Sequence, residues 1–101
     1  MKFRTDVPDI KFMKDGKLQF EVKSVQEFEE LEDRVIIRFA EHVDFLKRGY
    51  VCDIECEYLI VDQNESRIDT YKETVKDLVL VYINQKYEVA SIGYVEYTFY
   101  K

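Results

Sequence analysis

Three carboxylates and two thiols alternate along one short segment, Cys52-Asp53-Ile54-Glu55-Cys56-Glu57-Tyr58. Side chains at every second position of a β-strand point to the same face of a sheet, so this spacing predicts a strand with one acidic and one packed face. No Lys or Arg occurs from 49 to 66. The segment therefore contributes an acidic strip, formed by Asp53, Glu55 and Glu57, to the surface on which it lies.

An extended chain prevents this segment from forming a disulfide or a metal site. Residues four apart in a strand are separated by about 13 Å, roughly twice the Cα separation that a disulfide tolerates. Zinc requires both sulfurs at about 2.3 Å, and the acids, about 6.7 Å apart, cannot all ligate one calcium at about 2.4 Å. We interpret Cys52 and Cys56 as small buried hydrophobic residues, and we expect no metal and no cofactor.

Other residues offer little support for catalysis. Ser24 fits a helix cap and Ser66 fits a turn, and the chain contains no Gly-rich phosphate loop and only one His. Glu32 and His42 lie on the core side of a predicted helix, where burial would shift their pKa values. They are ten residues apart in the chain, which is about 15 Å along a helix axis, so they cannot act on one proton. We therefore do not expect an enzyme.

A long helix is predicted from Val25 to about Arg48. Ser24 and Glu27 fit a capping box, and Gly49 fits a stop at the C-terminal end. The apolar residues at helical spacing are Val25, Phe28, Leu31, Val35, Phe39, Val43 and Leu46. On this helix Ile37 and Phe45 would lie away from the core, where either a curled sheet or a partner or second copy would cover them.

Strands are predicted on both sides of this helix. The segments that we expect to form strands are 10–13, 17–22, 50–62, 67–76, 78–83 and 87–100. Turns are expected at Asp15-Gly16, at 63–66 and at 84–86. A second helix at 67–76 is the alternative to a strand there. The order β-β-α-β-β-β-β predicts one α+β domain over residues 1–101, in which an antiparallel sheet of about five to six strands grips one helix.

The net charge of −6 is unevenly distributed. Residues 27–65 contain twelve acids and four bases, a local balance of −8, so the remaining residues sum to +2. This distribution disfavours direct binding to nucleic acid or to an anionic membrane through a basic patch, and it favours a protein partner with a basic surface. If that partner binds nucleic acid, the acidic strip could compete for its basic groove.

Two features of composition bear on location and on the partner surface. The longest apolar run, Leu78 to Ile83, is too short to span a membrane, so we expect a cytoplasmic protein. The many Ile, Tyr, Glu and Lys residues suit the AT-rich genome of a bacterium, or of a phage in an infected host. All eight tyrosines lie at or after Tyr50. Tyrosine is frequent in half-buried sheets and also in interfaces, and on the second ground we add Tyr97 and Tyr100 to the expected partner surface.

These features predict a small acidic protein-binding module, most simply an inhibitor, immunity or accessory factor that binds a basic partner surface. Two alternatives remain open. One is a ligand-binding or enzymatic domain with a pocket between sheet and helix, lined by Glu32 and His42. The other is a structural subunit that self-associates, such as a virion or ring component, through Ile37 and the C-terminal tyrosines.

Overall fold

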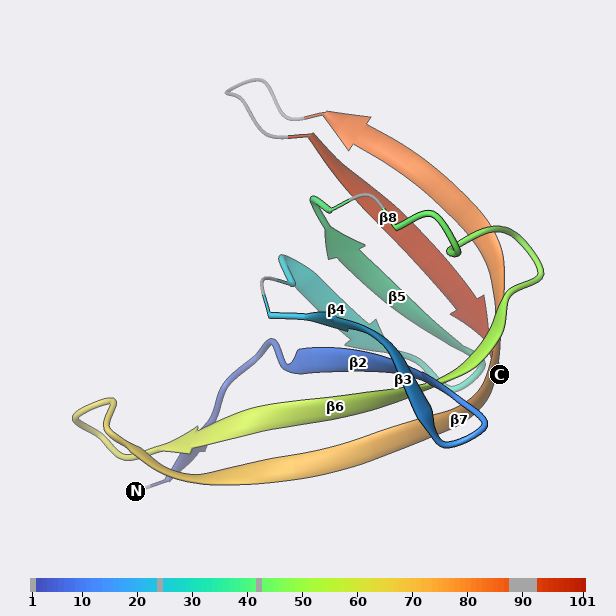
Figure 1. Ribbon diagram of the computed structural model, residues 1–101. Helices are drawn as coiled ribbons and strands as arrows, with labels where there is room; N and C mark the ends of the chain where they lie inside the picture. The colour runs from blue at the N-terminus through green and yellow to red at the C-terminus, as the bar shows by residue number, and fades with distance from the viewer. Residues whose placement is uncertain (1, 24, 42, 88–92) are drawn as a thin grey trace.

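The structure, a computed structural model, describes residues 2–23, 25–41, 43–87 and 93–101, which form eight β-strands and no helix (Figure 1). The strands are β1 (Phe3–Arg4), β2 (Asp9–Lys14), β3 (Lys17–Val22), β4 (Glu27–Glu30), β5 (Arg34–Phe39), β6 (Val51–Val61), β7 (Arg67–Tyr87) and β8 (Gly93–Tyr100). They form one antiparallel sheet in the order β3-β2-β6-β7-β8-β5-β4, and β1 also pairs with β6. The α+β class that the sequence pattern predicts is therefore wrong.

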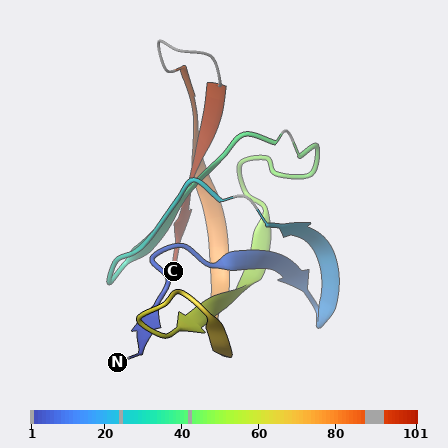
Figure 2. The same cartoon turned by 90° about the vertical axis from the view of Figure 1, so that its left-hand side faces the viewer.

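Strand β7 belongs to two layers of the folded sheet. Its residues from Arg67 to Val79 pair with β6, and those from Val79 onward pair with β8. Val79 is opposite both Val51 of β6 and Tyr100 of β8, so these two strands lie on opposite sides of β7. One layer contains β3, β2, β6 and the first part of β7, and the second layer contains the rest of β7, β8, β5 and β4 (Figures 1 and 2).

Two bulges bend β7 where it passes from one layer to the other. Lys76 and Asp77 together oppose Asp53 of β6, and Val81 is an extra residue relative to β8. Asp77 has a positive φ of 57°, a conformation that few residues other than glycine adopt. Each bulge reverses the face to which the following side chains point. The buried residues near the first bulge are Val75, Leu78 and Leu80.

The core lies between the two layers. The ring centroid of Phe12 in the first layer is 6.3 Å from that of Phe39 and 5.9 Å from that of Phe99, both in the second layer. The loop between β5 and β6 adds Val43 and Leu46 to this core, each 5% exposed. Burial of these apolar side chains between the layers is the main stabilising contribution that the fold offers.

The helix predicted from Val25 to about Arg48 is absent, and the hairpin of β4 and β5 lies in its place. The residue that distinguishes the two structures is Ile37, which would be exposed on the helix but is 0% exposed in β5. Val35 and Phe39 are also buried, but positions four apart fit the repeat of a helix and of a strand equally well. Three consecutive β-branched residues starting at Val35 favour the strand.

The residues that suggest helix ends have other roles. Glu27 forms an ion pair with Arg38 on the neighbouring strand. Gly49 lies in the loop before β6 with a φ of 90°, and its N–H donates to the carbonyl oxygen of Leu80 at 2.7 Å. Ser24 lies outside the described residues.

Several predicted strands are confirmed. Strands β2 and β3 form the expected hairpin, in which Asp15 and Gly16 have positive φ values of 53° and 75°. Strand β6 matches the acidic strand predicted at 50–62, and 67–76 is a strand, so a second helix there is wrong. The turn predicted at 84–86 is also wrong, because these residues continue β7 and pair with β8.

Replacing Ile37 by Ala tests the inward orientation of this side chain. We expect Ile37→Ala to lower the free energy of unfolding by about 2–4 kcal/mol, because it leaves a cavity in the core. The matched variant Ile36→Ala removes the same atoms from a half-buried side chain on the opposite face, so we expect a loss of about 1 kcal/mol. Urea denaturation measures both, and equal losses would contradict the strand.

Candidate functional site

The acidic strip lies on the outer face of the first layer, the face that points away from the core. Asp53, Glu55 and Glu57 are each half-buried. Cys52 and Cys56, which alternate with them, are 3% and 1% exposed. The prediction of one packed and one acidic face is therefore confirmed.

Burial also determines the chemistry of the two thiols. It raises the pKa of Cys52 and of Cys56 to about 12, and nearby carboxylates, Asp53 for Cys52 and Glu73 for Cys56, act in the same direction. The thiolate is the form that attacks electrophiles and binds metals. Both cysteines are free, and at neutral pH they remain protonated side chains of the core.

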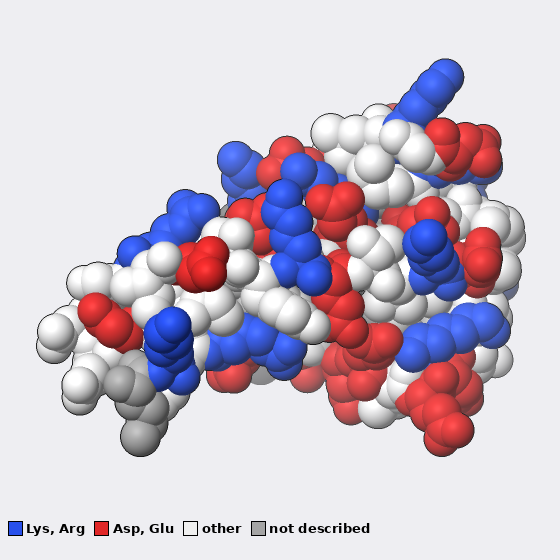
Figure 3. Space-filling view, turned by 90° about the horizontal axis from the view of Figure 1, so that it is seen from below, with Lys and Arg blue, Asp and Glu red and all other residues white. Residues whose placement is uncertain are grey.

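Basic residues of neighbouring strands border the acidic strip. Glu55 is opposite Lys11 of β2, and Glu57 is opposite Lys72 of β7. Side chains at such cross-strand positions are close enough to interact. Figure 3 shows the molecule from below the view of Figure 1, with acidic and basic side chains interspersed over this side. The sequence pattern does not predict this mixture, because the bases come from strands whose register with β6 is unknown beforehand.

Asp53 differs from Glu55 and Glu57 because its side chain forms a hydrogen bond that stabilises the fold. Its carboxylate oxygen accepts the backbone N–H of Asp77 at 2.9 Å. Asp77 lies in the first bulge of β7, where a backbone group loses its regular partner on the neighbouring strand. Asp53 therefore stabilises the bulge, and Glu55 and Glu57 remain for other contacts.

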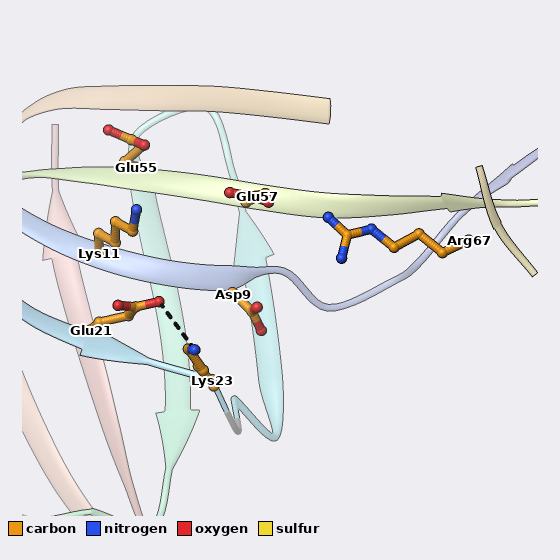
Figure 4. A pocket seen from close by; sticks show the side chains of 7 residues that line it. All are labelled: Asp9, Lys11, Glu21, Lys23, Glu55, Glu57 and Arg67. Atoms are coloured by element: carbon orange, nitrogen blue, oxygen red, sulfur yellow. Dashed lines mark ion pairs between the residues drawn. The ribbon is translucent and has the colours of Figure 1, made fainter. Parts of the chain in front are cut away.

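Glu55 and Glu57 line a charged groove of about 220 Å³ on the outer face (Figure 4). The remaining residues that line the charged groove are Asp9, Lys11, Glu21, Lys23 and Arg67. Arg67 extends from the start of β7 toward Glu57 (Figure 4). In the part of the chain that the structure describes, the one ion pair within the charged groove joins Lys23 Nζ to Glu21 Oε1 at 4.0 Å.

The charged groove is suited to binding charged groups. It presents four carboxylates and three cations, and each unpaired member can form a charge-assisted hydrogen bond with a group of opposite charge. No set of three His, Cys, Asp or Glu side chains among the described residues is placed to hold a metal ion.

The structure separates the other residues of the expected partner surface. Ile37 and Tyr97 are 0% and 2% exposed, and the Tyr97 ring stacks on Phe39 with centroids 5.0 Å apart. The prediction that Ile37 is exposed is wrong, because it rests on the absent helix. Phe45 packs partly against the core, and Tyr100 is half-buried on the outer face of the second layer.

The two residues of the expected pocket do not form one in the described chain. Glu32 is exposed in the turn between β4 and β5, and His42 lies outside the described residues. Because the described residues form no helix, a pocket between sheet and helix has no counterpart among them.

Comparison with known proteins assigns no family to this chain. No family model matches it, and no match is found among curated proteins or among solved structures. A helix able to cross a membrane is absent from residues 2–23, 25–41, 43–87 and 93–101.

The raised thiol pKa values predict both reactivity and pH dependence. We expect a thiol reagent at pH 8 to modify neither cysteine of the folded protein and to modify both cysteines in denaturant.

Above about pH 8.5 the unfolded state loses the thiol protons while the folded state keeps them, so the free energy of unfolding should fall as the pH rises toward 12. Denaturation of the Cys52→Val, Cys56→Val variant should show a weaker fall. An equal fall in both proteins would exclude the thiols as its cause.

The role of Asp53 can be separated from that of Glu55 by stability measurements. Asp53→Ala removes the acceptor for the Asp77 N–H, and we expect unfolding to require about 1–2 kcal/mol less. Glu55→Ala removes a carboxylate without a hydrogen bond in the described structure, and its effect should stay within about 0.5 kcal/mol. Chemical denaturation measures both losses of stability. A larger loss for Glu55→Ala than for Asp53→Ala would contradict the structural role of Asp53.

Proposed function

We propose that this protein is a small acidic binding module of the cytoplasm, an inhibitor, immunity or accessory factor, that binds a partner protein through the outer face of β2 and β6. One observation carries the proposal. Glu55 and Glu57 are half-buried in the charged groove, and neither has an ion pair or hydrogen bond within the described part of the chain. Such carboxylates can accept hydrogen bonds from Lys or Arg side chains of a basic surface.

The position of these acids in the sheet favours binding. Strand β6 is paired on both sides, with β2 and with β7, so its backbone is held in place before a partner arrives. A surface that is already ordered loses less conformational entropy on association. Binding through Glu55 and Glu57 therefore requires little rearrangement of the main chain.

The bases of the charged groove narrow the choice of partner. Lys11, Lys23 and Arg67 favour acidic groups on the partner at positions beside its bases. A partner whose acids and bases match the charges of the groove is bound specifically, and a partner surface that carries charges of one sign only is disfavoured. This mixture supports a patterned protein surface more strongly than a groove built for the uniform negative charge of a nucleic acid.

Each of the two alternatives loses one or more of the residues on which it rests. Self-association through Ile37 and Tyr97 would need side chains that are buried in the core. An enzymatic pocket with Glu32 would need a buried carboxylate, and Glu32 is exposed. We therefore retain the binding module as the proposal.

A double charge reversal tests this proposal. We expect Glu55→Lys, Glu57→Lys to weaken capture of a partner from an extract of the source cells by at least ~10-fold, because attraction becomes repulsion. The matched variant Glu29→Lys, Glu41→Lys changes two exposed acids outside the charged groove. Each reversal adds two charges, so both variants change the net charge from −6 to −2.

Mass spectrometry identifies the captured partner, and circular dichroism checks that each variant is folded. Capture that persists in the Glu55→Lys, Glu57→Lys variant would contradict the proposal. Equal loss in the control variant would assign the effect to net charge instead of the charged groove.

A further inference from the structure

The first part of β7 has one unpaired side. Strands β6 and β8 lie on opposite sides of β7, and β8 pairs only from Val79 onward. From Arg67 to Asp77, the side of β7 away from β6 has no backbone–backbone hydrogen bond to any described residue. In Figure 1 this side is the lower border of the first layer. We call it the free edge of β7.

One local contact shows which backbone N–H groups of β7 point toward the free edge. The N–H of Thr70 donates to the carboxylate of its neighbour Asp69 at 2.8 Å, instead of to another strand. Amides that point to the same side of a strand recur at every second residue. The N–H groups of Lys72 and Thr74 therefore point to the same side as that of Thr70, where a further strand could accept them.

The outer face along the free edge carries three cations between Arg67 and Lys76. Because Val75 is buried, the alternation of side chains along a strand places Lys72 and Lys76 on the outer face. Arg67 lies on the same face and is opposite Val61 of β6. These three cations are exposed, and none has an ion pair within 4.0 Å in the described parts of the chain.

The charge on this face differs in sign between the neighbouring strands β6 and β7. Strand β6 presents carboxylates, and the first part of β7, beside it, presents cations. Opposite charges at cross-strand positions stabilise a pair of strands, and like charges destabilise it. A strand added beyond β7 would therefore be favoured if it placed acids on the outer face.

We propose that the free edge of β7 binds an extended segment of a partner protein in which every second residue is Asp or Glu. The segment adds one strand to the first layer. Its main chain bonds with the exposed amides and carbonyls of β7, and its acids lie opposite Lys72 and Lys76.

A second copy of this chain fits the free edge less well. Its own acidic edge strand, β4, has four residues. Two of its acids are already engaged, Glu27 with Arg38 and Glu30 with Lys101. Lysines on an edge also prevent aggregation, and a binding experiment distinguishes that role from recognition.

Two synthetic peptides test the proposal, one alternating Glu with Val and one alternating Lys with Val. We expect fluorescence anisotropy to show at least ~10-fold tighter binding of the Glu peptide. The amides of Lys72 and Thr74 should become protected from hydrogen exchange when it binds. In the Lys72→Glu, Lys76→Glu variant the preference should reverse.

A proline control separates strand addition from simple charge attraction. Thr74→Pro removes an N–H from the free edge and leaves the amides that face β6 intact. We expect it to abolish protection by either peptide while circular dichroism stays unchanged. The proposal would be overturned if the Glu peptide still bound the Thr74→Pro variant, or if the two peptides bound equally. It would also be overturned if light scattering showed dimers in which the amides of Lys72 and Thr74 are protected.

Discussion

The corner of β7 is the constraint on which the rest of this structure depends. At the first bulge Asp77 adopts a positive φ, and its N–H donates to the carboxylate of Asp53 at 2.9 Å. Two residues later Val79 pairs with both β6 and β8. Without the bulge, the strand that turns Val75 inward would turn Leu78 outward, because side chains alternate along a regular strand. The bulge therefore lets one strand supply apolar side chains to the core on both sides of the corner.

The corner also determines the two surfaces for which we propose binding. Since β7 leaves the first layer after Val79, its earlier residues have a neighbour on only one side, and a free edge results. The same pairing places cations of β7 beside carboxylates of β6. Asp53 is engaged in the corner, so the proposed binding through the acidic strip rests on Glu55 and Glu57. The charged groove and the free edge thus follow from one arrangement of strands.

Elements whose residue pattern fits only one kind of secondary structure could be predicted from the sequence. Elements whose pattern fits both a helix and a strand could not. The Asp15-Gly16 turn requires positive φ at both residues, which few other pairs accept, and the hairpin follows from it. In the segment from Val25 to Arg48, apolar residues four apart fit both a helix and a strand. Ile37 and the β-branched residues beside it favour the strand, but the capping pattern favours the helix. Burial of Ile37 against the opposite layer decides between them, and this contact is not a local property.

The alternation from Cys52 to Tyr58 determines by itself that the thiols are buried and the carboxylates face outward, because the repeat of a strand is local backbone geometry. The neighbours of those carboxylates are decided only by the tertiary structure. Lys11 lies in β2, which three other strands separate from β6 in the sequence, and Lys72 lies in β7, the strand after β6; both reach β6 through the register of three strands. A change of register by one residue would turn every side chain of a strand to the other face. The acidic segment thus becomes a surface of both charges, since the pairing of β6 with β2 and with β7 places bases beside its acids.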